Sequence, residues 1–258
     1  MELPLYQLDA FADRLFSGNP AAVCPLPAWL PDTTLQAIAA ENNLSETAFF
    51  ARDGDGLRIR WFTPVCEVAL CGHATLAAAW VYFHLTPPHD RVVFNSQSGP
   101  LTVSRTGDLL SLDFPAAPPV PMATPPQLAA ALGVAPVEVL AAADWLVLLD
   151  DAAQLRALRP DMALLRQLDR RGVIVTARGE DCDFVSRFFA PNYGIDEDPV
   201  TGSAHTQLTP YWAAKLNRLT LQARQLSARG GTLHCELRGD RVLISGRVVP
   251  YLSGTLTL

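Results

Sequence analysis

The alternation of apolar and polar residues predicts several short strands and one helix in the first part of the chain. Residues 57–62 alternate between apolar and polar side chains, which is typical of a strand with one buried face. Residues 5–10 and 47–51 also have the short apolar pattern of strands. Between these strands, apolar residues recur at helical spacing after Asp32, which we expect to cap a helix that ends near Asn43.

The same order of elements recurs in the second part of the chain. Residues 152–168 have a helical pattern, residues 172–177 are rich in β-branched side chains, and residues 183–189 have the pattern of another strand. Each half therefore gives a helix followed by two strands.

A proline-rich segment, residues 115–126, separates the halves, and it cannot sustain a helix or an interior strand. We therefore expect an α+β fold with two similar lobes. Residues 1–114 form the N-terminal lobe, and residues 115–252 form the C-terminal lobe. The last residues, about 253–258, should form a strand that returns to the N-terminal lobe.

A longer motif strengthens the evidence for duplication. The pattern F-x-P begins at Phe62 and again at Phe189. Each copy is followed by an acidic loop, by the pattern x-G-[HS]-A-[TH] with its glycine at Gly72 or Gly202, and by a helix that carries a tryptophan. The loops differ in length, so we interpret the pattern as a diverged internal duplication.

Gly72 and Gly202 each precede a predicted helix, where the first backbone N–H groups have no partner within the helix. Such an N-terminus carries partial positive charge and can hold an anion. Two such helix N-termini facing one cleft could bind a carboxylate without Lys or Arg. The alternative is that both glycines only permit tight turns.

Glu46 is the first candidate for proton transfer. Leu44, Phe49 and Phe50 would exclude water from its carboxyl group and favour the neutral form, as a general acid or base requires. The alternatives are a surface glutamate, or a capping box formed by Asn43 and Glu46.

His73, in the first turn of its predicted helix, should be neutral there and able to donate a hydrogen bond to a substrate. The alternative for His73 is a packed histidine.

Asp198 lies just before the second of these predicted helices and is either a site residue or a solvated or capping acid. Ser203 either binds a carboxylate or caps that helix. Cys71 is either a thiol activated by the helix N-terminus or a small buried hydrophobe, and a two-thiol racemase would need a second cysteine where Thr201 stands.

Composition narrows the function classes. The chain has 258 residues, 49% of them hydrophobic and 18% charged, with a net charge of −6 and no basic cluster, so nucleic acid is an unsuitable partner. We expect no signal peptide and no membrane association, and the odd number of five cysteines without framework spacing predicts a reducing cytoplasm. No nucleotide-binding motif, serine-hydrolase motif or complete metal-ligand set is present, so we expect neither cofactor nor metal.

At these residues the chain resembles the phenazine-biosynthesis isomerase family (PhzF-like), which belongs to the diaminopimelate-epimerase fold superfamily. The matching pieces are Asp9-Ala10-Phe11, Gly18-Asn19-Pro20, Asn43-Leu44-Ser45-Glu46, Phe62-Thr63-Pro64, Gly72-His73, Glu197-Asp198 and Thr201-Gly202-Ser203. They occur in the family's order over most of the chain.

The resemblance implies two pseudo-symmetric lobes, each a β-sheet wrapped around a central helix, with the site in the cleft and often a homodimer. It implies that Glu46 is the acid/base residue, with His73 and Asp198 as further catalytic residues. Gly72, Gly202, Ser203 and Thr201 would bind the substrate.

The expected activity is a cofactor-independent isomerase that moves a proton on a small, carboxylate-bearing and cyclic or unsaturated metabolite. The alternatives are a racemase or epimerase of an amino-acid-like substrate, in which Cys71 would act together with Glu46 or Asp198, and a non-catalytic metabolite-binding protein.

Overall fold

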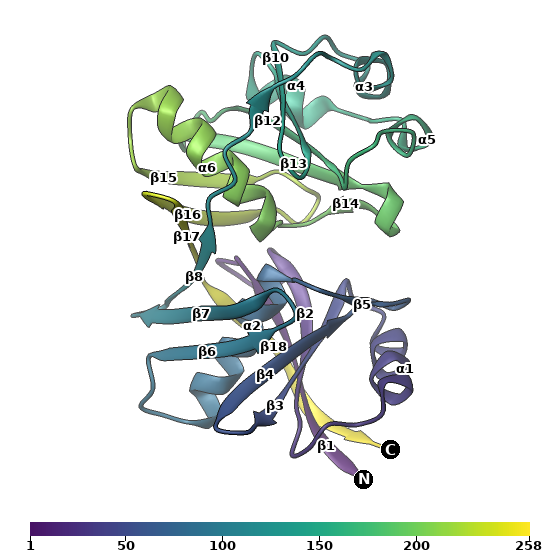
Figure 1. Ribbon diagram of the computed structural model, residues 1–258, viewed down its shortest axis with the longest axis vertical. Helices are drawn as coiled ribbons and strands as arrows, with labels where there is room; N and C mark the ends of the chain where they lie inside the picture. Colours follow the sequence, from purple (N-terminus) through teal and green to yellow (C-terminus); the bar gives the residue numbers. More distant parts are fainter. The chain divides into compact units, whose positions relative to one another are not determined.

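The computed structural model describes residues 1–258, which divide into two compact units (Figure 1). Unit 1 comprises Met1–Asp113 together with Ser245–Leu258, and unit 2 comprises Phe114–Ile244. The predicted boundary lies one residue later, and the chain returns to unit 1 before the predicted residue 253.

The elements of unit 1, in chain order, are β1 (Glu2–Ala10), β2 (Asn19–Pro25), α1 (Asp32–Asn42), β3 (Glu46–Asp53), β4 (Gly56–Phe62), β5 (Glu67–Val68), α2 (Gly72–Leu85), β6 (Arg91–Ser96), β7 (Gly99–Thr106), β8 (Leu109–Pro115) and β18 (Val248–Thr257). The last strand, β18, pairs antiparallel with β1 along its whole length. Pro250 lies within β18 opposite Leu8, beside an irregularity between Gln7 and Leu8 that lets the ladder accommodate a proline. The two chain ends therefore lie side by side (Figure 1).

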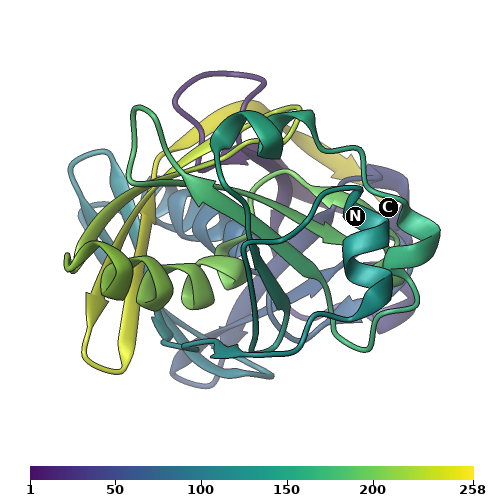
Figure 2. The ribbon, with the colours of Figure 1, turned by 90° about the horizontal axis from the view of Figure 1, so that it is seen from above.

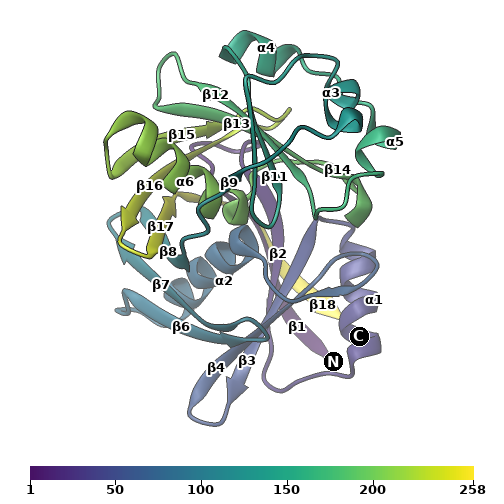
Figure 3. The ribbon, with the colours of Figure 1, turned by 45° about the horizontal axis from the view of Figure 1, so that its top comes forward.

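Helix α2 is the centre of unit 1. Its sequence is apolar on almost every side, as is typical of a helix surrounded by protein, and nine of its side chains are buried, from His73 to Phe83. Strands β1, β2 and β3 contact it, so the sheet wraps around this helix (Figure 3). Helix α1 packs on the other face of the sheet, where Leu35 and Ile38 join a core with Phe49 and Phe62.

The elements of unit 2, in chain order, are β9 (Val120–Pro121), α3 (Pro126–Leu132), β10 (Glu138–Ala141), β11 (Trp145–Leu148), α4 (Ala152–Ala157), α5 (Met162–Leu165), β12 (Val173–Arg178), β13 (Phe184–Ala190), the 3₁₀ turn η1 (Pro191–Tyr193), β14 (Ile195–Asp198), α6 (Gly202–Leu216), β15 (Thr220–Gln225), β16 (Gly231–Arg238) and β17 (Arg241–Gly246). Helix α6, light green in Figure 2, buries Leu208, Tyr211 and Trp212. A separate core of aliphatic residues from α3, α4 and α5 covers the opposite face of the strands.

Two local predictions are wrong. The helix predicted over 152–168 is two short helices, because Pro160 lies between them and Asp161 begins the second one by accepting hydrogen bonds from Ala163 and Leu164. Asp32 does not cap α1, whose N-cap is Pro31. The Asp32 carboxylate instead accepts a hydrogen bond from Arg60 at 2.8 Å.

The strand pairings repeat from one unit to the other. In unit 1, β2–β3 is parallel, β3–β4 antiparallel and β4–β6 parallel, and in unit 2 the pairs β11–β12, β12–β13 and β13–β15 follow the same pattern. Even an ion pair recurs, since Arg60 binds Glu67 through two bonds and Arg187 binds Glu197 in the same way. The fold is therefore α+β and internally duplicated, as predicted.

None of the helices has the length and hydropathy required to span a membrane.

Candidate active site

The first candidate site lies where α2 begins. Cys71 is the N-cap residue with an extended backbone, and the helix begins at Gly72, as predicted. The Thr75 hydroxyl donates to the Cys71 carbonyl at 2.5 Å and fixes this turn. Glu46, the first residue of β3, pairs with Ala21 of β2, and this register brings its carboxyl group to the helix start.

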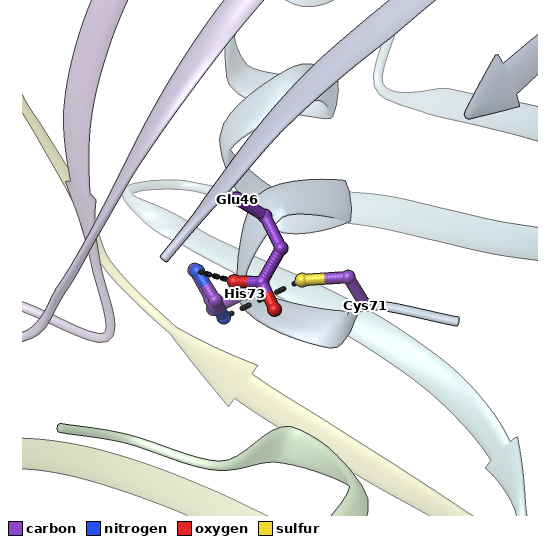
Figure 4. A group of neighbouring side chains, drawn as sticks. All are labelled: Glu46, Cys71 and His73. Atoms are coloured by element: carbon purple, nitrogen blue, oxygen red, sulfur yellow. Dashed lines mark hydrogen bonds and ion pairs between the residues drawn. The ribbon is translucent and has the colours of Figure 1, made fainter. Parts of the chain in front are cut away.

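Three side chains meet at this point, and the His73 ring contacts both of the others (Figure 4). Its Nε2 faces the Glu46 Oε2 at 3.3 Å, while its Nδ1 lies 3.5 Å from the Cys71 Sγ. Asn19, which is fully buried at the start of β2, places its side-chain nitrogen 3.2 Å from the same Nδ1. When the Asn19 amide donates to Nδ1, the ring proton resides on Nε2.

His73 is buried, and this burial lowers its pKa to about 3, against an opposing contribution from the Pro20 backbone carbonyl. The imidazole is therefore neutral at ordinary pH, as expected from the sequence, although desolvation rather than the helix dipole is the main cause. A neutral imidazole donates through one nitrogen and accepts through the other. His73 can therefore contact the Glu46 carboxylate without holding it in a permanent ion pair.

The alternatives for Glu46 are wrong. The residue is 9% exposed, so it is not a surface glutamate. Asn43 has a left-handed backbone and ends α1, and no helix begins there, so a capping box cannot form.

Glu46, Cys71 and His73 also offer three donor atoms within 4.8 Å of one another. The sequence predicts no metal site, and spatial proximity is the only signal for one. Glu46 and Cys71 face different nitrogens of the His73 ring.

The second set of predicted residues lies in unit 2. Asp198 is the last residue of β14, Thr201 is the N-cap of α6, and the helix begins at Gly202 as predicted. The Thr201 hydroxyl donates a short hydrogen bond to the Asp198 carboxylate. Asp198 is 8% exposed, so the solvated-acid interpretation is wrong for it. The side chain of Ser203 is half-buried in the first turn.

Sequence reasoning assigned no role to three buried polar residues around these helix starts. Asn19 stands only within the matching piece Gly18-Asn19-Pro20, although it contacts His73. Gln225 binds the loop between Asp198 and Thr201. His205 binds the Thr201 carbonyl through Nδ1 at 2.8 Å, as Thr75 binds the Cys71 carbonyl in unit 1.

A family model described as phenazine biosynthesis-like protein matches residues 8–254. A protein of Pseudomonas aeruginosa named an uncharacterized isomerase is 59% identical, with all of both chains covered. A crystal structure of a PhzF family phenazine biosynthesis protein from Enterococcus faecalis is similar with a TM-score of 0.97 and 46% identity, again over all of both chains. A hydroxyproline epimerase from Agrobacterium vitis has a TM-score of 0.64 at 11% identity, over 100% of this chain and 93% of that one, which is a likeness of fold alone.

Proposed function

The chain belongs to the phenazine biosynthesis-like protein family and is an isomerase, and we propose that it moves a proton on a small carboxylate-bearing metabolite with Glu46 as the proton carrier. The observation that carries this proposal is the contact between the Glu46 carboxyl group and the neutral His73 imidazole, both of them buried where α2 begins.

In this mechanism, Glu46 removes a proton from a carbon beside a carbonyl group or a double bond and returns it elsewhere on the same face. The displaced electron pair delocalises into the unsaturated system, so the substrate itself stores the charge between the two transfers. His73, whose Nε2 lies 3.3 Å from the Glu46 Oε2, donates a hydrogen bond to the substrate oxygen that carries negative charge. No redox change occurs, and proton transfer by side chains is sufficient for the net reaction.

The substrate carboxylate requires hydrogen-bond donors. We assign Gly72 to this role, because the first backbone N–H groups of the 14-residue helix α2 have no partner within the helix. We assign Gly202 and Ser203 of α6 to a second polar group of the substrate, and Asp198 to proton transfer or orientation there. Thr201 has its hydroxyl committed to Asp198, so its proposed part is to support that residue.

A racemase or epimerase is the second candidate function. The thiol of Cys71, the N-cap residue of α2, favours it, because the N-terminus of a helix stabilises a thiolate. Such an enzyme needs a base on each face of the substrate carbon. Cys71 and either Glu46 or Asp198 would supply them, since Thr201 cannot.

Solvent-deuterium exchange separates the possibilities. The wild-type protein is incubated in D₂O with a panel of cyclic and unsaturated carboxylates and of amino acids, and exchange is followed by NMR and chiral chromatography. Exchange with migration of a double bond supports the isomerase, whereas inversion at the exchanged carbon supports the epimerase. Binding seen by thermal shift without any exchange would refute both and leave a metabolite-binding protein.

We also propose that the protein acts in biosynthesis in the cytoplasm as a homodimer. All five cysteines are free in the structure, which supports a reducing compartment. Light scattering coupled to size-exclusion chromatography tests the assembly, and a monomer at micromolar concentration would contradict it.

A further inference from the structure

The internal duplication allows one position of a loop to be compared between the units, because this position holds an acid in unit 2 and none in unit 1. Glu67 and Glu197 hold equivalent places, because each is bound by an arginine of the preceding long strand. The next residue is Val68 in unit 1 and Asp198 in unit 2. The fold therefore builds this loop without a carboxylate at the second of these positions, and Asp198 is particular to unit 2.

Two further residues distinguish the loops. The N-cap residue of the following helix is Cys71 in unit 1 and Thr201 in unit 2. The neighbouring strand ends with Ser96 in unit 1 and with Gln225 in unit 2. The parallel pairings of β4 with β6 and of β13 with β15 place these two last residues at equivalent positions. Asp198, Thr201 and Gln225 thus form a set that has no counterpart in unit 1.

Gln225 binds the loop with both ends of its side-chain amide and is 1% exposed. Its oxygen accepts from the Thr201 backbone N–H at 2.9 Å. Its nitrogen donates to the Asp198 carbonyl at 2.7 Å and to the Thr201 hydroxyl at 3.1 Å. Because that hydroxyl accepts from Gln225, its own proton is directed to the Asp198 carboxylate. The hydrogen bonds therefore run in one direction, from Gln225 through Thr201 to Asp198.

We infer that Gln225 is a positioning residue that, through Thr201, fixes the carboxylate of Asp198 for the reaction; this inference rests on the proposed function, in which Asp198 contacts the substrate. Each member of a directed chain polarises the next, and a buried chain with every partner satisfied allows little freedom of rotation. In unit 1 the Ser96 hydroxyl donates to the Gly99 carbonyl at 2.7 Å within a short turn. It therefore does not support the loop before α2 as Gln225 supports the loop before α6.

The first measurement concerns only the hydrogen bonds between Gln225 and the loop that holds Asp198 and Thr201. Gln225→Met keeps the length of the side chain and removes both hydrogen-bonding ends. Amide hydrogen exchange of the free protein should show the Thr201 N–H exchanging at least about tenfold faster, while the amides of β12 and β13 keep their wild-type rates. Ser96→Ala is the matched control and should leave the Thr201 exchange rate unchanged. Equal acceleration of every amide in unit 2 would mean general destabilisation and would overturn the inference.

The second measurement uses the panel compound that the wild type exchanges fastest. Gln225→Met should lower kcat by about 10- to 100-fold with KM within about twofold, because displacement of a reacting group by a fraction of an ångström affects the transition state more than binding. In a double-mutant cycle, Gln225→Met should have no further effect on kcat once Asp198→Asn is present. Ser96→Ala should leave both constants unchanged.

The outcomes separate the inference from the function on which it rests. If the wild type exchanges no compound, or if Asp198→Asn is fully active, the proposed function or the place of Asp198 in it is overturned, and the inference falls with it. If Asp198→Asn is slow but Gln225→Met has normal kcat, the inference alone is overturned. Equal loss from Gln225→Met in both Asp198 backgrounds would also overturn it, because the glutamine would then act independently of Asp198.

Discussion

Two buried histidines make the folded protein sensitive to mild acid. Burial lowers the pKa of His73 to about 3 and that of His205 to about 4, from an ordinary value of 6.5. In the unfolded chain both imidazoles take up a proton near pH 6.5, whereas in the native state they stay neutral until the pH is far lower. The unfolded state therefore binds more protons between these values, and stability falls as the pH decreases below 6.5.

The magnitude follows from the same values. At pH 5 the unfolded imidazoles are almost fully protonated and the native ones are still neutral, so each histidine removes about 2 kcal/mol relative to pH 7.5. The two together remove about 4 kcal/mol, a large part of the stability of an ordinary domain.

Urea unfolding at pH 7.5 and pH 5, followed by tryptophan fluorescence, measures this loss. His205→Asn keeps a donor near the position of Nδ1, which bonds the Thr201 carbonyl, and removes the titrating ring. This variant should lose about 2 kcal/mol less than the wild type between the two pH values, and His73→Asn should behave in the same way. His89→Asn, at an exposed imidazole, is the matched control and should keep the wild-type dependence. If both buried-histidine variants kept that dependence as well, the imidazoles would not be neutral in the folded protein, and the reasoning would be wrong.

Three further predictions concern activity. Glu46→Gln keeps the size of the side chain and removes its titrating group, so kcat should fall by about two to four orders of magnitude with substrate binding retained, as measured by exchange rate and thermal shift. Cys71→Ala should retain kcat and lower the free energy of unfolding by only about 1 kcal/mol, because a small buried side chain is lost; a dead Cys71→Ala with an active Glu46→Gln would move the assignment to the thiol. Activity should also survive dialysis against a chelator, and loss that zinc restores would point to a metal held by Glu46, Cys71 and His73.

Much of the fold could be predicted because its signals are local. The alternation in β4 and the glycines before α2 and α6 depend on neighbouring residues only, and these elements begin or end within a few residues of the predicted positions. The helix expected over 152–168 failed for a local reason as well, since Pro160 outweighs the periodicity around it. A weak helical pattern should therefore be divided wherever a proline interrupts it.

The contacts of the site could not be predicted because they depend on strand register. Glu46 and His73 meet because β3 pairs in parallel with β2, which places Glu46 opposite Ala21, in the strand whose Asn19 contacts His73. No sequence pattern specifies that register. Gln225 did leave a signal, since Leu221, Ala223 and Gln225 occupy the buried positions of an alternating strand. A polar residue in a series of buried positions indicates that its side chain has a buried hydrogen-bond partner.

The residues that differ between the two duplicated units say more about the proposed proton transfer than the residues that the units share. The common frame supplies a glycine at the start of a helix and an arginine–glutamate pair in each unit. Glu46 has no acidic counterpart in unit 2, where the equivalent residue is Gly172. The equivalence follows from the next residues, because Thr47 pairs with Phe62 and Val173 pairs with Phe189. Asp198 belongs to unit 2 alone. A two-base enzyme built on a symmetric frame would carry the same base at equivalent positions of both units. In this chain Glu46 and Asp198 stand at different positions of the repeated frame, which favours two different tasks for them over the same task on opposite faces of the substrate.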